Sequence, residues 1–117
     1  MSGPAYKLID RDEWVATRAA GAYAGSAVDR ADGYIHMSTK AQLAETARRH
    51  YAGRSGLMLL EVDTAALGAE LRWEASRGGD LFPHLYGPLP ATAVIGERAL
   101  SVAGDGTMVF EDGANGW

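Results

Sequence analysis

The feature that most constrains the fold is a run of apolar residues, Leu57 to Val62, in which Glu61 is the single charged side chain. A run without alternation of polar and apolar residues is typical of a strand that is buried on both faces. Such a strand needs other elements on both of its sides. Residues 57–63 are therefore predicted as the central strand of a sheet.

Five further segments are predicted strands, because apolar, β-branched or aromatic residues lie between turn residues in each of them. They are residues 5–9, 34–38, 71–76, 93–102 and 107–110. Asp105-Gly106 predicts a hairpin turn between the last two.

Two helices are predicted near the N-terminus from pairs of capping residues. The pairs are Asp10 with Glu13, and Thr39 with Gln42. The helices run from these caps to Ala20 and to Gly53, and residues 21–33 are predicted as a connection. Together the elements predict an α+β fold, with one mixed, mainly antiparallel sheet of about six strands.

The chain of 117 residues is long enough for a single domain, residues 1–117. We expect its core at about 5–103, followed by a C-terminal hairpin and tail at 104–117. The net charge of −4 argues against general nucleic-acid binding but allows a small nucleotide ligand. The chain has no Cys, no predicted membrane span and no recognisable secretory signal, so we expect a cytoplasmic protein.

Residues 72–90 contain three of the four Pro residues and the Gly78-Gly79 pair, between large aromatic and ionisable side chains. Loops with reactive side chains between rigid residues often carry function. The alternative is an irregular connection whose apolar side chains, Leu81, Phe82, Leu85 and Tyr86, fill the edge of a core. The sequence alone leaves both interpretations open.

Alternation along strand 34–38 predicts that Ile35 and Met37 face the core, while Tyr34, His36 and Ser38 face the other side. This polar stripe ends at the start of a predicted helix, at Thr39, where free N–H groups accept phosphate or carboxylate. The alternative is a half-buried His36 that binds a backbone carbonyl. His50, near the end of the same helix, is predicted to be structural.

Strand 71–76 carries a second polar stripe, formed by Arg72, Glu74 and Ser76. Two stripes of complementary chemistry predict one cleft, although a solvated face would explain either stripe alone. His36 and His84 could then form an acid–base pair, because imidazole both accepts and donates protons near neutral pH. Arg72 or Arg77 would hold an anionic substrate. A metal site built on two distant His residues is only weakly indicated, and no metal is expected.

The sequence resembles the small bacterial proteins of the domain-of-unknown-function 952 family over roughly residues 5 to 100. The segments that carry the resemblance are Tyr6-Lys7-Leu8 with Trp14, Asp32 to Thr39 with Gln42, Leu59 to Asp63, Arg72 to Glu74 and Phe82 to Leu89. The resemblance implies a compact relative of the ADP-ribosyltransferase fold, in which NAD lies in a cleft between two sheets.

Motifs of that wider fold match this chain in part. Tyr6-Lys7 falls where a first-strand His would hold the ribose. The segment from His36 to Thr39 resembles the motif that supports the nicotinamide, and Glu74 and Glu97 are the candidates for the acidic residue. The resemblance thus implies a His-lined cleft for NAD or a related nucleotide.

The sequence predicts a nucleotide- or NAD-binding protein, with transfer at an anomeric carbon if it is an enzyme. Its alternatives are a non-catalytic binding module for a nucleotide or anion, and an interaction domain with residues 82–89 as the partner surface. The oligomeric state is left open. The candidate catalytic residues are His36, His84 and Glu74, and the candidate ligand-binding residues are Lys7, Tyr34, Ser38, Thr39, Arg72, Ser76, Arg77 and Tyr86.

Overall fold

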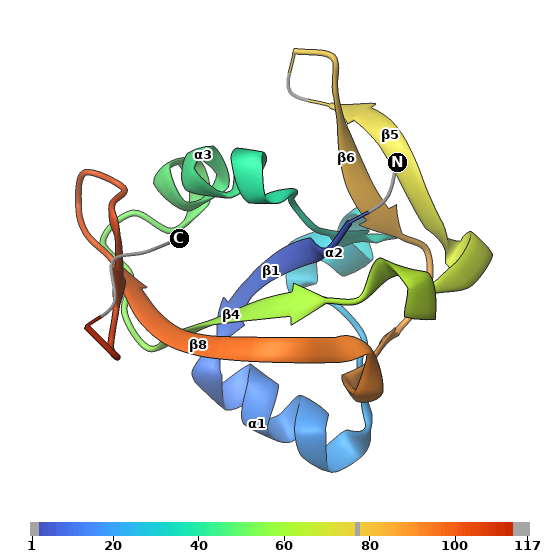
Figure 1. Ribbon diagram of the computed structural model, residues 1–117, viewed down its shortest axis with the longest axis horizontal. Helices are drawn as coiled ribbons and strands as arrows, with labels where there is room; N and C mark the ends of the chain where they lie inside the picture. Colours follow the sequence, from blue (N-terminus) through green and yellow to red (C-terminus); the bar gives the residue numbers. More distant parts are fainter. Residues whose placement is uncertain (1–2, 77, 114–117) are drawn as a thin grey trace.

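The computed structural model describes residues 3–76 and 78–113, which form a single α+β domain with antiparallel sheets (Figure 1). Its helices are α1 (Arg11–Ala20), α2 (Ala27–Asp32) and α3 (Lys40–His50). Its strands are β1 (Ala5–Asp10), β2 (Ala22–Tyr23), β3 (Ile35–His36), β4 (Leu57–Val62), β5 (Leu71–Ser76), β6 (Asp80–Leu85), β7 (Leu89–Pro90), β8 (Val94–Val102) and β9 (Met108–Phe110). The last four residues of the predicted tail lie outside the described part.

The apolar run forms β4, which lies inside a four-stranded sheet of order β1-β4-β8-β9, as predicted. Its alternate side chains enter two separate cores. Leu57 and Leu59 pack with Leu43 and Ala47 of α3. The other face of β4 packs with Trp14 of α1 and with residues of the smaller sheets. Helices α1 and α3 thus lie on opposite sides of this sheet (Figure 1).

The prediction of one sheet is wrong, because the described strands form three: the four-stranded sheet, the pair β2-β7, and a three-stranded sheet of order β3-β6-β5. Among the described residues, an isolated bridge between Tyr6 and Ser38 is the backbone pairing that links β1 to the segment after β3. Thr39 starts α3 immediately after this bridge, so the chain turns away before the two sheets can merge.

The segment predicted as a functional loop contains a regular strand, β6, at the centre of the three-stranded sheet. Proline is uncommon in a central strand because it has no N–H to donate to the ladder. The carbonyl of Pro83 accepts from Met37 N at 3.1 Å, one residue beyond the end of β3. The backbone nitrogen of Pro83 therefore points towards the segment after β3, where the strand has already ended. No hydrogen bond of the ladder between β6 and β5 is lost.

Helix α1 has the predicted bounds, but the predicted capping box is wrong. The Asp10 side chain caps nothing and instead accepts from Arg54 at 2.7 Å. Glu13 accepts from the Tyr23 hydroxyl at 3.2 Å. Tertiary partners therefore outcompete the local cap.

Residues 21–33 are not a plain connection, because they contain α2. Ser26 and Asp29 form a capping box at its start. The predicted box of Thr39 and Gln42 at the start of α3 is confirmed, although α3 ends at His50 rather than at Gly53.

Candidate functional site

Strand register brings the predicted polar stripes together. In the three-stranded sheet His36 lies opposite His84, and His84 lies opposite Arg72. Opposite residues on antiparallel strands share a face, and so do residues two positions apart. One face of this sheet therefore carries both histidines, with Glu74 and the aromatic residues next to them along the strands.

Rings from β3 and β6 pack into one cluster around Tyr34. The Tyr34 ring stacks on His84 with centroids 4.2 Å apart, and it lies 4.6 Å from the His36 ring and 5.1 Å from the Tyr86 ring. The centroids of the two imidazoles are 5.7 Å apart. The guanidinium of Arg72 covers the outer side of Tyr86 at 4.6 Å.

Glu74 fixes the orientation of His84. One carboxylate oxygen, Oε1, lies 2.8 Å from His84 Nδ1 and accepts from the Tyr86 hydroxyl at 2.7 Å. These two hydrogen bonds hold the pKa of Glu74 below its usual value, and the same contact raises the pKa of Tyr86. His84 Nε2 forms no hydrogen bond to any residue in the described part of the chain.

Asp29 holds a second, buried network together. Its carboxylate accepts from Lys7 Nζ at 3.0 Å, from Ser26 N at 2.9 Å and from His36 N at 3.1 Å, and it lies 2.6 Å from His36 Nδ1. Burial by itself raises the pKa of Asp29, but the His36 hydrogen bond and the Lys7 charge outweigh it and hold this pKa well below the usual range. Burial also lowers the pKa of Lys7, against the opposing effect of Asp29.

Both ring nitrogens of His36 contact carboxylates. While Nδ1 faces Asp29, Nε2 lies 2.9 Å from Asp32 Oδ2 at the end of α2. A neutral imidazole carries one N–H, so only the charged imidazolium donates to both carboxylates at once. This arrangement holds the His36 ring in place between the two carboxylates.

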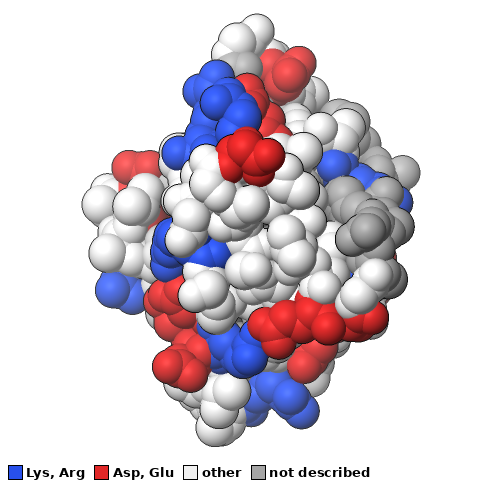
Figure 2. All heavy atoms as spheres, turned by 90° about the vertical axis from the view of Figure 1, so that its left-hand side faces the viewer, with Lys and Arg blue, Asp and Glu red and all other residues white. Residues whose placement is uncertain are grey.

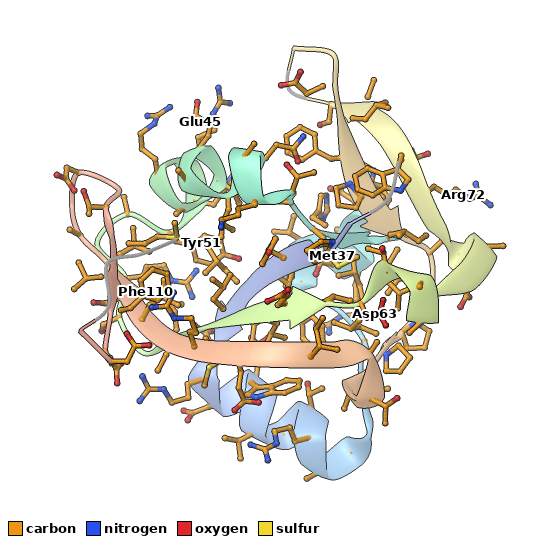
Figure 3. The ribbon with its side chains drawn as sticks, viewed as in Figure 1. Met37, Glu45, Tyr51, Asp63, Arg72 and Phe110 are labelled. Atoms are coloured by element: carbon orange, nitrogen blue, oxygen red, sulfur yellow. The ribbon has the colours of Figure 1, made fainter. Side chains whose placement is uncertain are left out.

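The two networks meet at one cavity of about 530 Å³ between β1, α2, α3 and β6. Its wall includes the predicted residues Lys7, His36, Ser38, Ser76 and His84. It also includes residues that were not predicted to have a role in the site, namely Asp29, Arg49, His50, Tyr51, Arg54 and Phe82. His50, predicted to be structural, lies in this wall. Tyr51 lies between α3 and the sheet, where its hydroxyl donates to Leu8 O at 3.0 Å (Figure 3).

Other predicted site residues do not line this cavity. Thr39 is occupied in the capping box of α3. Ser38, which does line the cavity, has its Oγ 2.9 Å from the Thr46 hydroxyl. Arg72 projects outward from the β5–β6 hairpin and does not line this cavity, and its role as an anion clamp stays a prediction (Figure 3). Arg77 lies outside the described residues.

Three further candidates from the sequence also have local partners. Glu74 and Tyr86 support His84 from outside the cavity wall. Glu97, the other acidic candidate, accepts from Trp14 Nε1 at 2.9 Å on β8. Glu97 is therefore a packing partner of α1.

The segment 82–89 does not present the apolar surface that an interaction domain requires. Phe82, Leu85 and Leu89 are buried in the core or beside the cavity. On the face shown in Figure 2, acidic and basic side chains are interspersed, without a large patch of one sign. The cavity is thus a better candidate for ligand binding than the segment 82–89 or the face shown in Figure 2.

The cavity wall has more basic than acidic side chains although the chain is acidic overall. Lys7, Arg49 and Arg54 line the cavity together with the carboxylate of Asp29. Each of these cations also has a carboxylate partner, in Asp29, Glu45 and Asp10 respectively. Across residues 3–76 and 78–113, no group of three or more His, Asp or Glu side chains is placed to hold a metal ion. None of the helices within the same residues is long and apolar enough to cross a membrane.

Two solved structures of protein CC0527 from Caulobacter crescentus are similar to this chain. The crystal structure is 47% identical over 93% of this chain and 94% of the other, with a TM-score of 0.85. The solution NMR structure is 48% identical over 88% and 89%, with a TM-score of 0.77. None of the curated proteins matches. The names of the similar structures state no activity, so the ADP-ribosyltransferase-like fold stays a prediction.

A family model described as protein of unknown function (DUF952) matches residues 8–97. This range contains β2 to β7, the helices α1, α2 and α3, and the residues of both networks around the cavity except Lys7. The chain belongs to the DUF952 family.

Proposed function

We propose that this protein binds a small phosphorylated ligand of the nucleotide type in the cavity between β1, α3 and β6. The observation that carries the proposal is the cavity wall, in which three Lys or Arg side chains and three His rings accompany one carboxylate. A volume of about 530 Å³ lies within the range of small-molecule sites, about 300–1,000 Å³.

The other lining residues suit a nucleoside. Tyr6 and Phe82 offer apolar ring surface, and the hydroxyls of Ser26 and Ser76 suit a sugar. NAD and ADP-ribose are the first ligands to test, because the family resemblance implies them.

A non-catalytic binding module is the second candidate. It is favoured by the position of His36, whose two ring nitrogens are both engaged by carboxylates and so are not free for proton transfer. Under this alternative the same ligands bind and are not converted.

The test is thermal unfolding of the purified protein with NAD, ADP-ribose, mononucleotides and phosphorylated RNA ends. A ligand at ~100 times its Kd stabilises the folded state by about 2.7 kcal/mol. The matched variant is Lys7→Met, which removes a cation from the wall while Ser26 and His36 still hold Asp29. Arg18→Gln is the control, because Arg18 lies exposed on α1.

We expect a rise in Tm with at least one phosphorylated ligand, reduced in Lys7→Met and retained in Arg18→Gln. A panel without any shift, or an equal shift in both variants, would refute the proposal.

A further inference from the structure

We propose that the cavity is also a catalytic site, in which His84 acts as the general base in hydrolysis of a phosphodiester. This inference rests on the proposed function, since it assumes that the phosphorylated ligand binds beside His84. It adds the reaction and the bond that is broken.

His84 has the environment of a general base. Glu74 accepts from Nδ1–H, which leaves the lone pair of a neutral imidazole on Nε2. The ring is buried and borders the cavity, and Nε2 has no partner among the described residues. Tyr86 fixes Glu74, and Tyr34 stacks on the ring at 4.2 Å. A base held by an orienting carboxylate is the arrangement that activates hydroxyl groups and water.

The charges around the cavity favour chemistry at phosphorus over cleavage at an anomeric carbon. Anomeric cleavage develops positive charge, which an unpaired carboxylate stabilises. The one carboxylate in the wall, Asp29, is already engaged by Lys7 and His36. Attack at phosphorus develops negative charge on oxygen, which fixed cations stabilise. Lys7, Arg49 and Arg54 are the cations in the wall, and a phosphate would share them with their carboxylate partners.

The step balances without a further reactant. His84 Nε2 takes a proton from water while the water oxygen forms a bond to phosphorus. The bond between phosphorus and the ester oxygen breaks, and that oxygen leaves with a proton from solvent. The products are a phosphomonoester and an alcohol, and His84 returns its proton to solvent. His36, whose ring nitrogens both contact carboxylates, takes no part in this proton transfer.

The test is hydrolysis of 2′,3′-cyclic AMP, which presents a nucleoside and a phosphodiester in one small molecule. The product is measured by chromatography. NAD is the parallel substrate. The variants are His84→Gln, Glu74→Gln and the exposed control Arg18→Gln. Thermal melts establish that each is folded, and Glu74 is the safer substitution because 36% of its side chain is exposed.

The expected rate of the unmodified protein rises over the pH range in which imidazoles lose a proton. In His84→Gln the rate should fall by about 10²–10⁴-fold and should no longer rise over this pH range. Glu74→Gln should lower kcat with little change in KM and alter the pH profile, as expected for a positioning residue. Arg18→Gln should behave like the unmodified protein.

Other outcomes separate this inference from the proposed function. Binding of 2′-AMP or 3′-AMP in calorimetry without turnover of the cyclic nucleotide would overturn the inference and leave the proposed function standing. Cleavage of NAD without hydrolysis of the phosphodiester would also overturn it. If the protein neither binds the mononucleotides nor hydrolyses the cyclic nucleotide, both this inference and the proposed function are refuted.

Discussion

Asp29→Asn is the substitution that most directly tests how the site is built. Asp29 is 2% exposed, and Lys7, its ionic partner, is 6% exposed. The amide keeps one acceptor oxygen and turns the other into a donor. On the Oδ2 side the new donor would meet Ser26 N and Lys7, and on the Oδ1 side it would meet His36 N. Neither orientation satisfies all of these donors, and Lys7 loses its counter-ion.

Removing one partner from a buried ion pair costs about 3–5 kcal/mol. For a domain near this size each kcal/mol lowers Tm by about 4 °C, so we expect a fall of about 12–20 °C at pH 7. The control is Asp112→Asn, because Asp112 forms an exposed pair with Arg98 and such pairs contribute about 0–1 kcal/mol. The double variant with Lys7→Met should recover much of the loss, since it removes the stranded ammonium.

The pH dependence of stability is a second test of the same substitution. Because the folded pKa of Asp29 is held below its ordinary value of 3.8, its stabilising effect is present above about pH 4 and is lost as the pH falls through the folded pKa. The difference in Tm between the unmodified protein and Asp29→Asn should therefore narrow in acid. A variant that melts within about 2 °C of the unmodified protein at pH 7 would refute the reasoning.

Three further predictions concern other parts of the fold. Thr39→Ala should cost about 1 kcal/mol in chemical denaturation, because Gln42 N loses its capping oxygen at the start of α3, and an unchanged midpoint would contradict the role of the cap. Gly106→Ala should lower Tm, because Gly106 has φ of +93° and an added Cβ would lie 2.7 Å from the Arg48 side chain, whereas Gly104→Ala meets no atom within 4 Å and is the control. Burial raises the pKa of Tyr51 to about 12, so the unmodified protein should lose stability relative to Tyr51→Phe as the pH rises from 10 towards 12, and parallel alkaline stability curves would contradict this.

The elements that the sequence predicts well are those with strong local signals. The apolar run of β4 and the capping box of Thr39 and Gln42 are local, and no tertiary contact overrides them. Alternation correctly separates buried Ile35 and Met37 from Tyr34 and His36 on the other face. These signals place His36 on the polar face, whereas the position of His84 beside it follows from the pairing of β3 with β6.

The missed elements had weak or misleading local signals. Helix α2 has only six residues, too few for a periodic pattern, although Ser26 and Asp29 have the spacing of a capping box. Strand β6 contains Pro83 and so looked irregular, because the sequence does not reveal which neighbour its backbone nitrogen faces. The pairing of Lys7 with Asp29 joins residues 22 positions apart, and only the packing of α2 against β1 and β3 brings them together.

The network at the cavity is easier to explain by function than by stability. Lys7 lies on β1 between Ala5 and Ile9, whose side chains enter an apolar core. Replacing a buried ion pair by apolar side chains of similar volume often leaves a protein equally stable or more stable, because each buried charge carries a desolvation penalty. An apolar residue at position 7, with a matching change at position 29, would therefore serve the core at least as well. The chain instead holds an ammonium and an imidazole ring around one carboxylate in the wall of a cavity. Departures from local consistency of this kind are expected where a site is maintained for a ligand.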